Sequence, residues 1–240
     1  GTTSTASIDP VAEIASLARE YGAWLHVDAA YGGPAAMVPE LRSRFDGWEL
    51  ADSVVVNPHK WLFTPIDCSV LYCRKPDDLA RAFTLVPEYL SSSETGSARS
   101  LMDYGVSLGR RFRSLKLWFV LRYFGRLGLI ARIRHHIDLA RDFAGWVESE
   151  PGWSVLAPVE LGAVAFRYEL PGAAADADAL NRAILNGVNA SGEAFMTHTS
   201  LNGRTALRAA IGNIKTTRAD VERLWALLRE AAEAGLDGGT

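Results

Sequence analysis

The sequence predicts an α/β protein that ends in a smaller α+β unit. Amphipathic helical segments alternate with short apolar runs up to residue 73, whereas several short strands lie between helices after residue 151. Alternation favours a sheet with parallel neighbours, and clustered short strands favour an α+β layout. In addition, Asp28 and Lys60 each stand at or just beyond the end of a predicted strand. Ligands of open α/β sheets bind outside the carboxyl ends of strands, so a site is expected there.

Composition excludes several classes of function. The 240 residues are 48% hydrophobic, which is enough for one large core or two smaller ones. The net charge of -3 gives no field that would attract nucleic acid, so small-molecule chemistry fits better. Residues 1–5 lack the basic and apolar regions of a targeting segment. The apolar residues 115–130 are interrupted by Lys116, Arg122 and Arg126, which predicts a buried helix, no membrane span and a soluble protein.

Cysteine and histidine usage indicates neither a disulfide nor a metal site. Cys68 and Cys73 lie five positions apart in one predicted strand, so their side chains face opposite ways and cannot easily bridge. Unpaired cysteines are typical of a reducing compartment, which predicts a cytoplasmic location. No histidine stands at metal-ligand spacing from a cysteine, so no metal is expected.

The first predicted elements are a helix and a buried strand. Asp9 can cap a helix that begins at Pro10, and Gly22 ends it. Residues 23–28 form an apolar run too short for a helix, which predicts a strand. Asp28 at its carboxyl end is either a turn-forming residue or a carboxylate aimed at a cationic nitrogen in a pocket.

A lysine follows the next predicted strand. Small residues at positions 29–34 let a ligand approach the main chain, and the apolar residues 53–56 predict a strand that Pro58 stops. Lys60 follows beside Trp61. Desolvation can lower the pKa of such a lysine and make its amine a nucleophile toward a carbonyl, although most lysines in this position are simply solvated.

The middle of the chain contains a long loop and two helices. A strand is predicted at residues 68–73 and a short helix after residue 76. Residues 85–109 lose periodicity and are rich in Ser, Gly and Thr, which favours a functional lid loop. Helices are expected at 109–125 and 127–148, and their arginines are interpreted as structural rather than as a nucleic-acid patch. After the Pro151-Gly152 break we expect strands at 153–156, 163–168, 195–201 and 206–211 and helices at 178–190 and 218–234.

Three motifs carry a family resemblance. The sequences GTT at 1–3, HVDAAY at 26–31 and NPHKW at 57–61 resemble, in this order and spacing, the pyridoxal-phosphate-dependent group II amino-acid decarboxylases. Residues 108–118, LGRRFRSLKLW, resemble the branch that acts on aromatic L-amino acids. The resemblance implies the pyridoxal 5'-phosphate (PLP)-dependent transferase fold type I.

The resemblance also implies how the chain is organised. Residues 1–150 would be the C-terminal part of the large PLP-binding domain, with the lid loop and connecting helices, and residues 151–240 the small C-terminal domain. The family acts as a homodimer with sites shared between subunits. Only about the second half of its pattern is present, and the upstream half supplies the phosphate loop, the ring-stacking histidine and most of the substrate pocket. A companion N-terminal segment or chain is therefore expected, because the chain resembles one piece of a cleaved or split enzyme, or a truncated relative.

The resemblance assigns roles to individual residues. Lys60 would hold PLP as a Schiff base, and Asp28 would keep the pyridine nitrogen protonated. Ala30 would pack on one face of the ring. Thr3 would hydrogen-bond near Asp28 or the cofactor oxygens. The phosphate end would be held with the help of Asn57 and His59.

Two further residues bear on the reaction. Tyr89 matches the loop tyrosine that protonates the substrate carbon after carbon dioxide leaves, whereas relatives with phenylalanine there tend to be aldehyde synthases. Gly109 stands where plant relatives that act on indoles tend to have glycine. The expected function is PLP-dependent decarboxylation of an aromatic L-amino acid to its amine. The alternatives are an aromatic aldehyde synthase, or a catalytically silent scaffold or partner chain.

Overall fold

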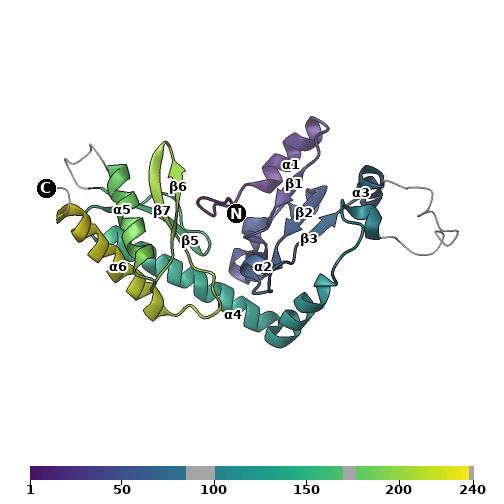
Figure 1. Ribbon diagram of the computed structural model, residues 1–240. Helices are drawn as coiled ribbons and strands as arrows, with labels where there is room; N and C mark the ends of the chain where they lie inside the picture. The colour runs from purple at the N-terminus through teal and green to yellow at the C-terminus, as the bar shows by residue number, and fades with distance from the viewer. Residues whose placement is uncertain (85–100, 170–176, 238–240) are drawn as a thin grey trace.

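A long helix connects two lobes of the protein. The computed structural model describes residues 1–84, 101–169 and 177–237. Helix α4 (Arg113–Ser149) runs beneath an N-terminal lobe with a three-stranded sheet and a C-terminal lobe with a four-stranded sheet (Figure 1). The predicted α/β organisation followed by an α+β unit is confirmed, and the division at residue 150 stays a prediction. None of the helices in the described ranges has the length and apolar character that a membrane crossing requires.

The N-terminal sheet has the order β1-β2-β3. Strands β1 (His26–Asp28) and β2 (Ser53–Val56) are parallel, and β3 (Val70–Cys73) runs antiparallel to β2. Helix α1 (Val11–Glu20) packs on the sheet through a small apolar cluster. The crossover that a parallel pair needs consists of three 3-10 helices, η1 (Gly33–Met37), η2 (Pro39–Phe45) and η3 (Trp48–Leu50).

The two ends of α1 test the predictions of its boundaries. Gly22 ends the helix as predicted, with φ +59°. The Ala23 N–H then donates to the Ala18 carbonyl at 2.8 Å, which is the closing hydrogen bond of a Schellman motif. The predicted Asp9 cap is wrong, because Pro10 occupies the N-cap position and no side chain caps the helix.

Strand boundaries are shorter than predicted. The strand expected at 23–28 begins at His26, and the one expected at 68–73 begins at Val70. Cys68 therefore precedes β3 and is buried, whereas Cys73 lies within the strand. Both cysteines are free, which confirms that they do not pair.

Helix α4 is bent at Gly125. It begins at Arg113 and not at the predicted residue 109, and the Arg113 Nε–H donates to Asp67 Oδ2 at 2.9 Å. Gly125 has φ +62° and ψ 172°, which are not helical angles and divide the helix where two helices were predicted. Helix α3 (Pro76–Phe83) and η5 (Leu101–Tyr104) stand on either side of residues 85–100. The lid-loop prediction for those residues lies outside the described part of the chain.

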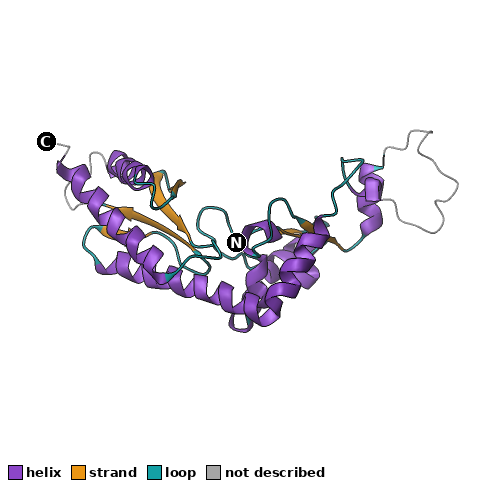
Figure 2. Ribbon diagram, turned by 60° about the horizontal axis from the view of Figure 1, so that its bottom comes forward, coloured by secondary structure: helices purple, strands orange, loops and turns teal. Residues whose placement is uncertain are grey.

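The C-terminal sheet is antiparallel throughout, with the order β4-β5-β7-β6. Helix α5 and the second part of α4 pack against it, and α6 packs against these two helices (Figure 2). Four side chains at the centre of this core are 0% exposed: Phe143, Phe166, Leu207 and Leu228. The bounds are β4 (Trp153–Val155), β5 (Ala163–Tyr168), α5 (Ala177–Ala190), β6 (Thr197–Leu201), β7 (Arg204–Ala210) and α6 (Arg218–Asp237).

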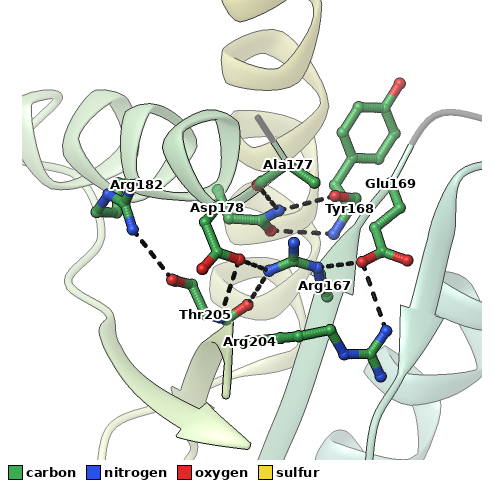
Figure 3. A network of polar contacts seen from close by, with 9 residues as sticks. Arg167, Tyr168, Glu169, Ala177, Asp178, Arg182, Arg204 and Thr205 are labelled. Carbon is green, nitrogen blue, oxygen red and sulfur yellow. Dashed lines mark hydrogen bonds and ion pairs between the residues drawn. The ribbon is translucent and has the colours of Figure 1, made fainter. Parts of the chain in front are cut away.

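A polar network around Arg167 ties this sheet to α5 (Figure 3). The Arg167 side chain is only 4% exposed and forms ion pairs with Glu169 at 2.5 Å and Asp178 at 2.6 Å. It also donates to the Thr205 carbonyl. A buried charge is tolerated only when it is paired and hydrogen-bonded, so the network is structural.

The lobes meet through an apolar cluster and through polar links that include the Arg44–Glu160 ion pair. Ser4 and Thr199 share a hydrogen bond of 2.8 Å between their hydroxyls, and the Ile8 N–H donates to Glu160 Oε2 at 2.9 Å. The cluster comprises Ala6, Ala35, Val38, Phe45, Trp61, Ile130, Ile133, Ile137, Leu161 and Ala163. It places Trp61, the neighbour of Lys60, at the junction of both lobes and α4.

Candidate active site

The carboxyl ends of β1 and β2 lie side by side. Their parallel register pairs Asp28 with Val55. Beyond the strands, the Ala29 N–H donates to the Val55 carbonyl at 2.9 Å, and the Asn57 N–H donates to the Ala30 carbonyl at 3.1 Å. The two chain segments that bear the predicted site residues are thus joined by main-chain hydrogen bonds at one edge of the sheet.

Asp28 presents a carboxylate at this edge. Its Oδ1 accepts a hydrogen bond of 2.9 Å from the Ala30 N–H, which fixes the side chain in an Asx-turn arrangement. The residue is exposed, and the described part of the chain gives its carboxylate no cationic partner within ion-pair distance. Ala29 and Ala30 behind it are 1% and 6% exposed. The carboxylate is therefore held in place and still free to bind a cation.

Lys60 projects from a single helical turn. Helix α2 (Pro58–Trp61) starts at the proline, which suits the first turn of a helix because its missing N–H would have no partner there. Lys60 is exposed, which agrees with the solvated alternative, and within the described residues its ammonium forms no ion pair or hydrogen bond. The apolar neighbour Trp61 is instead buried beneath the turn.

Asn57 and His59 are tied to the segment that precedes β3. The Ser69 hydroxyl donates to Asn57 Oδ1 at 2.6 Å. His59 Nδ1 lies 2.6 Å from the Cys68 carbonyl and 3.0 Å from its N–H, so this nitrogen bonds to the Cys68 main chain in either tautomer. Both side chains stabilise the turn around Lys60, and their predicted phosphate role stays a prediction.

The segment that contains Thr3 approaches the same motif. Residues 2–7 form a tight loop in which the Ala6 N–H donates to the Thr2 carbonyl at 2.8 Å. The Thr3 side chain is exposed and has no hydrogen-bond partner in the described ranges, so no bond to Asp28 is seen. A Cβ added at Gly32 would lie 2.9 Å from the Gly1 nitrogen, which places the start of the loop beside the turn that follows β1.

Two predicted residues are not placed with this group. Tyr89 lies outside the described residues, so its role stays a prediction. Gly109 is exposed, and a Cβ added there would meet no atom within 4 Å, so the structure gives no reason for glycine at this position. No group of His, Cys, Asp or Glu residues in the described part could hold a metal ion.

Sequence reasoning missed a layer of aromatic side chains beneath the site. The Tyr31 ring stacks on the Trp61 indole with centroids 4.8 Å apart, and the Trp61 Nε1–H donates to His136 Nδ1 at 3.0 Å. Tyr31 and Trp61 lie within the motifs around Asp28 and Lys60, and this position in the motifs is the sequence signal that could have identified them. His136 is 75 residues beyond Trp61, and no local pattern connects the two.

Two buried polar atoms at the lobe junction are unsatisfied. The Tyr31 hydroxyl and Arg208 Nε are the buried side-chain atoms without a hydrogen bond in the described ranges. Burial raises the pKa of Tyr31, and the Arg208 guanidinium acts in the opposite direction, so the two side chains lie near each other. The Tyr31 hydroxyl lies beside Gly162, where an added Cβ would be 3.0 Å from it, and the Gly162 main chain also acts to lower the pKa of Tyr31.

The α/β sheet that presents a carboxylate and an amine at adjacent strand ends has the fold of solved PLP-dependent decarboxylases, which belong to the fold type I class. Comparison with known proteins identifies the family within that class. Residues 1–169 match the pyridoxal-dependent decarboxylase conserved domain. The chain belongs to this pyridoxal-dependent decarboxylase family.

Similar proteins place the chain in the aromatic amino-acid branch. It is 42% identical to a tryptophan decarboxylase of Camptotheca acuminata, over 97% of this chain and 47% of the relative. It is 41% identical to a phenylacetaldehyde synthase of Arabidopsis thaliana, over 97% of this chain and 48% of the relative. A crystal structure of Oryza sativa TDC with PLP and tryptamine superposes with a TM-score of 0.90 at 38% identity, covering 98% of this chain and 49% of that one. The chain thus spans about half the length of the relatives it matches.

The residues at the strand edge fit PLP in part. Asp28 offers an unpaired anion for a pyridinium nitrogen, and Lys60 offers an unpaired amine for an aldehyde. Ala30 is only 6% exposed, and its predicted contact with the ring stays a prediction. No comparable set of donors for a phosphate is seen among the described residues, because Asn57 and His59 bond to the neighbouring segment. The described residues therefore include side chains suited to bind the ring of PLP, but no comparable set suited to bind its phosphate.

Proposed function

We propose that this chain forms part of a PLP-dependent decarboxylase that converts an aromatic L-amino acid to the amine and carbon dioxide. The observation that carries the proposal is the parallel pairing of β1 and β2, which brings the segments of Asp28 and Lys60 to one edge with both charges unpaired. Membership of the decarboxylase family supports it.

The proposed roles follow from the chemistry of each side chain. PLP, when bound, supplies an aldehyde that condenses with amines and a ring that accepts the electron pair left by decarboxylation. Lys60 would hold the cofactor covalently and be displaced by the substrate amine. Asp28 would keep a proton on the ring nitrogen, because a nearby anion raises the pKa of that group.

Two alternative functions account for fewer of the observations. The similarity to a phenylacetaldehyde synthase favours an aldehyde synthase, but the tyrosine at position 89 favours simple decarboxylation within this family. A catalytically silent partner chain would need no accessible amine or carboxylate at the strand edge, yet Lys60 and Asp28 are both exposed there. Decarboxylation therefore accounts for more of the observations.

We further propose that the working enzyme is a homodimer completed by a companion N-terminal segment. The chain matches only about half the length of its relatives, and strand β1 forms one edge of the N-terminal sheet. Parallel sheets are usually covered on both faces and extended beyond two parallel strands, so additional chain is expected at this edge. The cytoplasmic location predicted from the cysteines remains part of this proposal.

Borohydride trapping tests the role of Lys60. The chain has four lysines, Lys60, Lys75, Lys116 and Lys215. Incubation with PLP, reduction with borohydride and peptide mapping should place most of the pyridoxyl label on Lys60, and Lys60→Arg should remove that label and leave the others. An even distribution over the four lysines, both alone and with the companion segment added, would refute the function.

A further inference from the structure

His136 is a buried histidine that the proposed reaction does not use directly. It lies on α4 and is only 1% exposed. Its Nδ1 accepts the hydrogen bond from the Trp61 Nε1–H at 3.0 Å. The two ring planes differ by only 11°, so the rings lie nearly parallel.

Trp61 fills a slot directly beneath the lysine-bearing turn. Its side chain is 0% exposed, and Tyr31 stacks on one face at an interplanar angle of 10°. Gly162 closes the slot from the C-terminal lobe, where an added Cβ would lie 3.0 Å from the indole and equally close to the Tyr31 hydroxyl. Since the indole N–H is the only hydrogen-bonding group of this side chain, the bond to His136 leaves no unsatisfied donor on Trp61 in the core.

We propose that His136 is a positioning residue for Lys60, because it fixes the indole on which the turn α2 rests. This inference rests on the proposed function of Lys60. Helix α2 has only four residues and no side-chain cap, so it cannot hold its own shape. The other polar anchors of the turn, from Asn57 and His59, lie at partly exposed positions. The bond to His136 is the anchor within the core.

The bond requires a neutral imidazole. Nδ1 must be unprotonated to accept, so the ring proton is on Nε2, and a hydrogen bond to the main chain of Asn213 serves it. Burial, and then the neighbouring His135, lowers the pKa of His136 from 6.5 to about 4. His136 is therefore in the accepting form at neutral pH, and it links α4 to the segment after β7 as well as to Trp61.

Matched variants separate positioning from packing. His136→Phe keeps a flat ring and removes the acceptor, whereas His136→Asn retains an acceptor near the position of Nδ1. The share of pyridoxyl label on Lys60, relative to Lys75, Lys116 and Lys215, should fall about tenfold in His136→Phe, the factor for loss of roughly one hydrogen bond. It should be largely restored in His136→Asn. His135→Phe changes the exposed neighbour and should leave the share unchanged.

The indole N–H gives a readout that needs no cofactor. In nitrogen-15 spectra the Trp61 Nε1–H should exchange slowly with solvent in the unaltered chain and in His136→Asn, and faster in His136→Phe. A folded His136→Phe with an unchanged Lys60 share overturns the positioning role, and so does an unchanged exchange rate. If the unaltered chain shows no preference for Lys60, either alone or with the companion segment added, the proposed function fails, and a slow indole signal would then show a bond that is only structural.

Discussion

At the scale of single residues, we expect Tyr89 to decide between two reaction outcomes. The family resemblance implies that this tyrosine donates a proton to the substrate carbon, and that role stays a prediction. We expect Tyr89→Phe to divert the reaction of the complete enzyme from amine and carbon dioxide to aldehyde, ammonia, carbon dioxide and hydrogen peroxide, with molecular oxygen as the oxidant. Amine yield should fall at least about tenfold, as for loss of a general acid. Product analysis with a peroxide assay checks this.

Tyr104 provides a matched control for that substitution. It lies in η5, close in sequence to the same loop, and is partly buried. Tyr104→Phe should leave the ratio of amine to aldehyde unchanged. An amine yield in Tyr89→Phe equal to that of the unaltered enzyme would exclude the proton-donor role.

A second prediction at this scale concerns pH and His136. Its pKa is about 4 in the folded protein and 6.5 without the fold, so the unfolded chain binds more protons between these values. Folding stability should therefore fall as pH decreases from 6.5 toward 4, by at most about 1.4 kcal/mol per pH unit from this group. Above pH 6.5 the contribution is constant.

Denaturant unfolding at several pH values measures this effect. The free energy of unfolding should decline toward pH 5 more steeply in the unaltered protein than in His136→Asn, which has no titrating group at that position. Other carboxylates titrate in both proteins and cancel in the comparison. Identical slopes would mean that His136 is not held neutral by the fold.

At the scale of elements, the bend in α4 depends on Gly125. Its φ of +62° and ψ of 172° belong to a region that is essentially restricted to glycine. Gly125→Ala should lower the free energy of unfolding by about 1–3 kcal/mol, because the side chain makes this backbone conformation unfavourable. A Cβ at this position would meet nothing within 4 Å, so the expected cost is conformational and not a clash.

Gly145 in the same helix is the control for this prediction. It is exposed, has ordinary helical backbone and would also place a Cβ in open space. Gly145→Ala should therefore stabilise the protein by up to about 1 kcal/mol, through the higher helix propensity of alanine. Opposite signs for the two substitutions in thermal unfolding would support the bend, and equal signs would contradict it.

At the scale of the whole molecule, the first part of α4 leaves an apolar surface open. The exposed large side chains there are Leu115, Trp118, Phe119, Leu121 and Tyr123. Contiguous apolar patches are uncommon on monomers and usually mark contacts with other chains. We expect the protein to sediment as a dimer or larger at micromolar concentration, and the double change Trp118→Ser and Phe119→Ser to weaken association about tenfold or more.

Phe195 in the C-terminal lobe is the comparison for that surface. It is 81% exposed, and Phe195→Ser should not affect association through α4. A monomer in sedimentation of the unaltered chain, with or without the companion segment, would refute the dimer. Equal effects of both changes would show nonspecific hydrophobic association instead of a defined interface.

Much of the local structure was predictable because it depends on neighbouring residues. Gly22 ended α1, Gly125 divided α4, and Asn202 with Gly203 closed the hairpin between β6 and β7, each through a positive φ. The errors lay at boundaries. Asp9 did not cap α1. Strand β3 started at Val70 rather than Cys68, because strand ends are set by hydrogen-bonded partners elsewhere in the chain.

The candidate site was likewise predictable from the sequence only in part. Motif order and strand ends in the sequence pointed to Asp28 and Lys60, because side-chain chemistry and strand-to-turn punctuation are local properties. The tertiary fold alone decided that Lys60 is exposed above a buried Trp61 and that the Trp61 indole donates to His136. Burial and hydrogen bonding between residues 75 positions apart depend on how helices and strands pack, which no local sequence pattern specifies.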